Sequence, residues 1–240
     1  MASSSTPATP LLYACIAHNT TILAECSTTS ASSQTSSLAS IILPKIDHTT
    51  PQKLTYTHGT NHIHYIASSP SEYPPTQSTA GGLTYLVISD SAAVNRRISF
   101  GFLVELRRRF LTQYPASTTD FADLPHYGCG SFNGAVKGLM VEYGTTAHGR
   151  DDAIGNAQRE IEDVKGIMTR NIEGLLERGE RIDLLVDKTD RLGGSAREFR
   201  VRSRGLKRRM WWKNVKLMGL LGLVVVLILV TIVVSVKNSV

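Results

Sequence analysis

The sequence is poor in cysteine, with three in 240 residues, at positions 15, 26 and 129. An odd number of widely spaced cysteines, without any Cys-x-x-Cys pair, excludes a disulfide framework or a zinc module as the organising principle of the fold. We therefore expect Cys15, Cys26 and Cys129 to be reduced thiols on the cytosolic side of a membrane.

Signatures of catalysis are also missing. The sequence has no Walker lysine motif, no GxGxxG after a predicted strand, no HExxH and no GxSxG. His58, His62 and His64 form its one histidine cluster; His62 and His64 alternate along a strand and could bind a metal, but a solvated strand face is the favoured interpretation. His126 and Cys129 lie in a glycine-rich loop without a third ligand. The sequence predicts no enzyme, no cofactor and no metal site.

Long apolar runs are absent except for one. Residues 217–236 contain no charged side chain, and as a helix they would be about 30 Å long, which matches the hydrocarbon core of a bilayer. The lack of a second run excludes a multi-span transporter. Because only residues 237–240 follow, we expect a tail anchor with a short lumenal tail.

Positive charge is concentrated beside this run. Residues 197–216 hold nine basic and one acidic side chain, whereas residues 1–143 hold eight of each. This asymmetry predicts a cytosolic N-terminal side, and each cation near anionic headgroups contributes about 1 kcal/mol. A nucleic-acid arm is disfavoured by the adjacent span. The membrane-proximal residues are Lys207, Arg208, Arg209, Trp211, Trp212, Lys213 and Lys216, within which residues 211–216 form the juxtamembrane segment.

Residues 1–143 have the patterns of an α+β domain. Hydrophobic alternation and helical spacing predict, in order, strands at 11–17 and 21–26, a helix over 38–46, strands at 53–57, 63–67 and 83–89, and helices over 91–111 and 131–143. This order is typical of a small antiparallel sheet flanked by helices. The Ser/Thr-rich residues 27–35 predict a mobile loop, and the Pro/Ser/Gly-rich residues 68–82 predict a disordered excursion.

A different periodicity follows the linker at residues 144–150. Within residues 151–210, sixteen positions recur in alternating steps of three and four, which is the seam of a coiled coil. The other positions are mostly polar, so the pattern favours assembly with other helices over packing on the chain's own domain. The seam positions are Ile154, Ala157, Ile161, Val164, Met168, Asn171, Leu175, Arg178, Ile182, Leu185, Thr189, Leu192, Ala196, Phe199, Ser203 and Leu206.

Arg178 is the unusual member of this seam, because it lies between Leu175 and Ile182. A guanidinium among aliphatic layers is costly unless acceptors satisfy it. Neighbouring seam positions of its own chain offer none, so partner helices must supply them, and neutral amide oxygens would do so without a second buried charge. Such a layer fixes the register. The alternative is an arginine that reaches solvent past the interface.

These residues resemble a known family. Residues 164–192 resemble the synaptobrevin-type SNARE motif, in which Arg178 takes the place of the central arginine, and residues 207–216 resemble the membrane-proximal segment of synaptobrevins. Residues 54–66 and 84–110 resemble the longin domain of SNAREs related to vesicle-associated membrane protein seven. The chain is identified as a longin-type R-SNARE: a longin domain, a coiled-coil SNARE helix and one C-terminal transmembrane helix.

The resemblance implies vesicle fusion. An R-SNARE on one membrane pairs with three Q-SNARE helices on the other, and the longin domain regulates or targets it. The other function considered is a tail-anchored tether or trafficking adaptor that is not fusogenic, which would need the coiled coil but not Arg178. Family likeness favours a late endosomal or vacuolar (lysosomal) membrane, with a secretory vesicle as the alternative.

The resemblance also implies that the SNARE motif can fold back onto the longin domain. The groove expected for this contact lies beside the first helix and the third strand, and the seam residues expected in it are Ile161, Val164 and Met168. The alternative is that the groove residues simply pack on their own sheet. The groove residues are Leu38, Ile41, Ile42, Leu54 and Tyr56.

Overall fold

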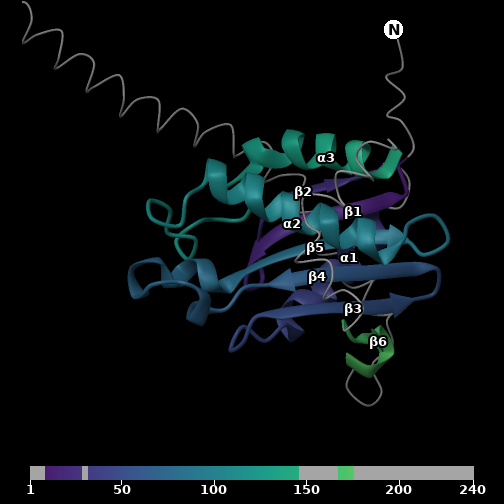
Figure 1. Ribbon diagram of the computed structural model, residues 1–240, viewed down its shortest axis with the longest axis horizontal. Helices are drawn as coiled ribbons and strands as arrows, with labels where there is room; N and C mark the ends of the chain where they lie inside the picture. The colour runs from purple at the N-terminus through teal and green to yellow at the C-terminus, as the bar shows by residue number, and fades with distance from the viewer. Residues whose placement is uncertain (1–8, 29–31, 146–166, 176–240) are drawn as a thin grey trace, which may run out of the picture. The chain divides into compact units, whose positions relative to one another are not determined.

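A mixed sheet of six strands forms the centre of the computed structural model, which describes residues 9–28, 32–145 and 167–175. The strand order is β2-β1-β5-β4-β3-β6 (Figure 1). The strands are β1 (Leu11–His18), β2 (Thr21–Ser27), β3 (Gln52–His58), β4 (Asn61–Ala67), β5 (Leu83–Asp90) and β6 (Thr169–Asn171). The helices are α1 (Ser32–Ile42), α2 (Arg96–Gln113) and α3 (Asn133–Thr145).

Two tight hairpins set the registers of the sheet. β1 and β2 are joined across Asn19, whose φ is 50°, and β3 and β4 are joined across Gly59, whose φ is 55°. Asn and Gly are the residues that best tolerate this left-handed conformation, which two-residue hairpin turns require. The four strands that these hairpins join are the ones predicted at residues 11–17, 21–26, 53–57 and 63–67.

The central strand β5 separates two hydrophobic clusters. Seven of its eight residues are buried, because helices cover both faces of the sheet. Tyr85 and Val87 belong to the cluster under α2 and α3, whereas Leu86 and Ile88 belong to the cluster under α1. This division follows from the period of two along a strand, which sends successive side chains to opposite faces.

Two segments expected to lack structure are ordered, which corrects the prediction. Helix α1 already begins at Ser32, within the stretch predicted as a loop. Residues 68–82 form two 3-10 segments, Pro70–Glu72 and Pro75–Gly82. A capping box between Ser69 and Glu72 starts the first one, so local side-chain bonds satisfy a backbone that composition alone suggested was free.

The ends of the helices also differ from the predicted bounds. Helix α2 begins at Arg96 rather than Ser91, because Asn95 caps it by accepting a hydrogen bond from the Arg97 amide at 3.0 Å. Helix α3 continues to Thr145, into the predicted linker. The remaining six predicted elements of residues 1–143 are present in the predicted order.

The two edges of the sheet are protected differently. Along β2, the Tyr127 amide donates to the Ile22 carbonyl at 2.8 Å and the Cys129 amide donates to the Leu23 carbonyl at 3.1 Å. At the opposite edge, β6 covers β3 in the parallel direction. The five strands from residues 11–90 are antiparallel as predicted, and β6 is the addition that makes the sheet mixed.

Candidate functional site

The candidate site is the β3 edge together with residues 167–175, which we call the docked segment. Its strand β6 aligns Thr169 with Thr55 and Asn171 with Thr57, and the Thr55 amide donates to the Met168 carbonyl at 3.1 Å. A 3-10 turn, Ile172–Leu175, follows the strand. Figure 1 shows the docked segment, in green, beside β3. A segment of the predicted coiled coil is therefore an edge strand here, not a helix.

The α1 side of the sheet holds the docked segment through one isoleucine. The Ile172 side chain is fully buried, and Leu175 packs at the margin of the same cluster. The longin residues of this cluster nearest to the expected groove are Leu38, Ile42, Leu54 and Tyr56. Four of the five predicted groove residues thus come together. Ile41 is half-buried and lies outside this cluster.

The α2 side holds the docked segment through Ile167 and Arg96. Ile167 is 9% exposed and joins the cluster under α2. The Arg96 guanidinium, on the first residue of α2, donates to the Ile167 carbonyl at 3.3 Å and to the Thr169 hydroxyl at 2.5 Å. The docked segment is therefore held by an apolar contact on each face of the sheet and by one arginine.

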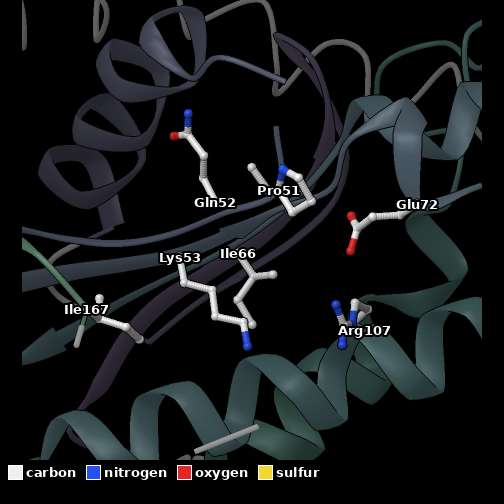
Figure 2. Close-up of a pocket in the computed structure, with 8 residues that line it drawn as sticks. Pro51, Gln52, Lys53, Ile66, Glu72, Arg107 and Ile167 are labelled. Atoms are coloured by element: carbon white, nitrogen blue, oxygen red, sulfur yellow. The ribbon is translucent and has the colours of Figure 1, made fainter. Parts of the chain in front are cut away.

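A cavity of about 430 Å³ lies next to Ile167. Figure 2 shows Lys53, from β3, and Arg107, from α2, extending into the same space, with Glu72 beyond them. Ile66 and Ile167 supply apolar wall. The docked segment thus forms one wall of a partly basic cavity between the sheet and α2.

His64 lies on β4 and is buried, so the solvated strand face predicted for it is wrong. Its side chain is fully buried, Nδ1 is 2.9 Å from the Thr55 hydroxyl, and its ring meets the Phe100 ring edge-on at 5.3 Å. Burial lowers the pKa of His64 to about 3, so the ring is neutral at cytosolic pH. His62 is only half-buried, and burial and the charge of Arg96 lower its pKa.

Metal binding is not supported by the arrangement of these side chains. Among the residues that the structure describes, no three His, Cys, Asp or Glu side chains lie close enough to hold a metal ion. None of the three cysteines, all of which lie in the described ranges, forms a disulfide bond. Burial raises the pKa of the Cys15 thiol to about 12 and that of Cys129 to about 11, so both are protonated.

The docked segment buries residues outside the predicted seam. Met168, a seam residue expected to be covered, is 58% exposed, and Asn171 is exposed as well. Ile167 and Ile172, which flank the seam, are buried instead. The reason is geometric: an extended strand repeats every two residues, so it cannot turn a stripe with a period of 3.5 towards one surface. The sequence signal for this contact was the presence of two isoleucines beside the seam.

Other predicted residues lie outside the described part of the chain. They include Arg178 and the anchor at residues 217–236; within the described ranges, no helix is long and apolar enough to cross a membrane. The seam residues outside those ranges are Ile154, Ala157, Ile161, Val164, Arg178, Ile182, Leu185, Thr189, Leu192, Ala196, Phe199, Ser203 and Leu206, and the membrane-proximal residues 207–216 are outside them too.

Comparison with known proteins identifies the family. The longin family, described as a regulated-SNARE-like domain, matches residues 23–136, and the synaptobrevin family matches residues 153–233, which include the docked segment. The chain is 34% identical to vesicle-associated membrane protein 7B of Dictyostelium discoideum, over 94% of this chain and 80% of that one. It is 34% identical to vesicle-associated membrane protein 712 of Arabidopsis thaliana, over 91% of each chain.

A mammalian relative gives the same result. The chain is 33% identical to vesicle-associated membrane protein 7 of Rattus norvegicus, over 94% of this chain and 93% of the relative. Matches of this length span both the longin domain and the SNARE region. The chain therefore belongs to the longin R-SNAREs of the vesicle-associated membrane protein 7 group, and it is a vesicle R-SNARE that acts in membrane fusion and trafficking.

Proposed function

We propose that this R-SNARE alternates between two states, and that its longin domain controls the change. In the closed state, residues 167–175 are the docked segment. In the open state, the same residues are part of a helix over residues 151–210 that zippers with three Q-SNARE helices. The observation that carries the proposal is the pairing of β6 with β3.

The two states exclude each other for a simple physical reason. The Met168 carbonyl accepts the Thr55 amide when the segment is docked, whereas in an α-helix it accepts an amide four residues further along the same chain. Ile172 likewise faces the α1 cluster in one state only. Any Q-SNARE that binds the helical form therefore draws the population away from the closed state.

Docking on this edge is expected to be readily reversible. Burial of Ile167 and Ile172 contributes about 2–3 kcal/mol each. The hydrogen bonds from the Thr55 amide, the Thr57 hydroxyl and the Arg96 guanidinium contribute about 1 kcal/mol each. Fixing the backbone of the nine residues 167–175 costs about 1 kcal/mol per residue, which is of the same size as the gain. A brake of this strength slows assembly without preventing it.

The open state gives Arg178 its role. In the proposed bundle, Arg178 is the central polar layer and binds glutamine side chains of the three Q-SNAREs, which fixes the register. Residues 217–236 anchor the chain in the vesicle membrane, and residues 207–216 contact anionic headgroups. Zippering towards the anchor then brings two bilayers together. We place the protein on an endosomal or vacuolar membrane, with a cytosolic N-terminus and without any catalytic step.

The test is a fusion assay with the full chain in liposomes and cognate Q-SNAREs in a second set. Arg178→Ala should abolish or strongly slow lipid mixing, while Arg181→Gln, a matched charge removal outside the seam, should leave it nearly unchanged. Deletion of residues 1–143 should speed assembly and leave its end point the same. Equal small effects of the two arginine changes would favour the non-fusogenic tether instead.

A further inference from the structure

A side-chain hydrogen bond between Arg96 and Thr169 joins α2 to the docked segment. The two guanidinium nitrogens of Arg96 divide their hydrogen bonds between the Ile167 carbonyl and the Thr169 hydroxyl, at 3.3 and 2.5 Å. Thr169 itself is exposed. A hydroxyl on the surface of an extended strand, already in contact with an arginine, has the features of a phosphate-accepting site.

The charge around Thr169 favours an anion. The register places Thr169 beside Thr55, on the sheet face that also carries His62 and His64. Burial lowers the pKa of both histidines most, and the positive charge of Arg96 lowers the pKa of each further, so Arg96 contributes positive potential at this corner of the sheet. A phosphate placed there would be attracted, and it would in turn favour the protonated form of the half-buried His62.

Thr169 is also placed so that a modification would not block assembly. It directly follows the seam residue Met168, so in the proposed helix its side chain lies outside the layers that contact partner helices. Lys165 precedes it by four residues, a spacing at which opposite charges attract on one helix. A phosphate would therefore act on the closed state and leave the assembled bundle intact.

We propose that Thr169 is a phosphorylation site, and that Arg96 binds the phosphate and fastens the docked segment to the longin domain. The inference deepens the proposed function, because the closed state is the one that the phosphate stabilises. A protein kinase would transfer the γ-phosphoryl group of a nucleoside triphosphate to Thr169 Oγ1. The new O–P bond replaces the bond to the leaving nucleoside diphosphate, and the hydroxyl proton passes to the base of the kinase.

The phosphate strengthens a contact that already exists. It carries about −1.5 to −2 charges at pH 7 and three strong acceptor oxygens, where the neutral hydroxyl offers one oxygen. A planar guanidinium can donate two parallel hydrogen bonds to such a group, and these charge-assisted bonds are roughly twice as strong as neutral ones. We expect the phosphate to form one or two new charge-assisted hydrogen bonds with Arg96. These bonds should raise the equilibrium constant for docking about tenfold.

The experiment uses the full chain in nanodiscs, with phosphothreonine incorporated at position 169 by an expanded genetic code. Amide exchange of Thr55, which donates to Met168, reports docking, and the rate of assembly with Q-SNARE helices reports its consequence. The phosphate should slow both by about tenfold. Arg96→Gln should remove the effect of the phosphate. Arg97→Gln, which removes an equal charge from the exposed neighbouring residue, should preserve it.

Each result decides the proposal. The proposal is wrong if the phosphate leaves Thr55 exchange and the assembly rate unchanged, or if it speeds them. It is also wrong if the phosphate has the same effect in Arg96→Gln as in the wild type. The unmodified chain tests the closed state separately: if its Thr55 exchange equals that of a chain lacking residues 151–240, the proposed brake fails. Even if the brake fails, the modification site is supported when the Thr55 amide becomes protected from exchange in the phosphorylated chain and loses this protection in Arg96→Gln.

The modification itself is tested on protein purified from its own cells. Mass spectrometry of a peptide that spans residues 165–173 should show the mass of one added phosphate, which phosphatase removes and Thr169→Ala abolishes. Absence of the phosphorylated peptide from both growing and starved cells overturns the assignment.

Discussion

Replacement of Ile172 by alanine should open the docked segment without weakening the SNARE bundle. Ile172 is fully buried against the α1 cluster, but it lies outside the predicted seam. Its matched control is Met168→Ala, because Met168 is a seam residue that is 58% exposed in the docked segment. Ile172→Ala should therefore weaken docking and leave the bundle intact, whereas Met168→Ala should leave docking unchanged and weaken the bundle.

The size of the effect follows from the area that is lost. Ile172→Ala removes three carbon atoms from a side chain that is fully buried when docked and free when undocked. At about 0.8 kcal/mol for each buried methylene, the docked state loses about 2 kcal/mol, or roughly 30-fold in the docking equilibrium. Met168→Ala should change docking by less than about 0.5 kcal/mol, as surface substitutions do, while it removes one apolar layer from the bundle.

Hydrogen exchange and assembly kinetics measure the two effects on the same proteins. In Ile172→Ala, the amide of Thr55 should exchange faster and pairing with Q-SNARE helices should start sooner, with the thermal stability of the final bundle preserved. In Met168→Ala, exchange should match the wild type and the bundle should melt earlier. The reasoning is refuted if Ile172→Ala leaves Thr55 exchange unchanged, or if Met168→Ala releases the segment equally.

Three further predictions concern the domain and its anchor. His64 has a pKa of about 3 when folded and about 6.5 when unfolded; the unfolded chain binds the proton first, so the free energy of unfolding should fall below pH 6.5, by about 2 kcal/mol at pH 5. The urea midpoint should therefore be lower at pH 5 than at pH 7, and His64→Phe should reduce the difference between the two midpoints. If His64→Phe leaves that difference unchanged, the prediction is wrong. Gly138→Ala should raise the melting temperature, because a glycine within a helix is destabilising by up to about 1 kcal/mol relative to alanine and a Cβ at this position meets nothing within 4 Å. Gly81→Ala should lower the melting temperature, because its Cβ would clash with the Pro70 backbone. Deletion of residues 217–240 should release the protein from membranes in a sedimentation assay, and retention in the pellet would argue against the anchor.

The domain could be predicted well from local patterns. Asn19 and Gly59 mark the two hairpins because few other residues accept a positive φ. The helix predicted over residues 91–111 from its helical spacing is present as α2, and its apolar residues Phe102, Leu106 and Phe110 are buried. These features depend on neighbours within a few residues, so the sequence displays them directly.

The candidate site was predicted only in part. Leu38, Ile42, Leu54 and Tyr56, which were assigned to a groove from their apolar character, lie in one cluster with Ile172. The seam residue Met168, which was expected in that groove, is exposed. Arg96 was missed altogether, because nothing in its local sequence marks an arginine at the start of a helix as a partner of a residue 73 positions away.

The sequence by itself determined the family, the order of the elements and a seam suited to a coiled coil, because periodicity and caps are local properties. Tertiary structure decided which period applies to residues 167–175. Without the docked segment, the β3 edge would leave backbone groups unpaired. Burial of Ile167 and Ile172 on opposite faces of the sheet stabilises the extended form of residues 167–175. The helical pattern of the same residues is satisfied only by partner helices, which the chain does not supply alone. Under the proposed function, one segment encodes two structures, and the available surface selects between them.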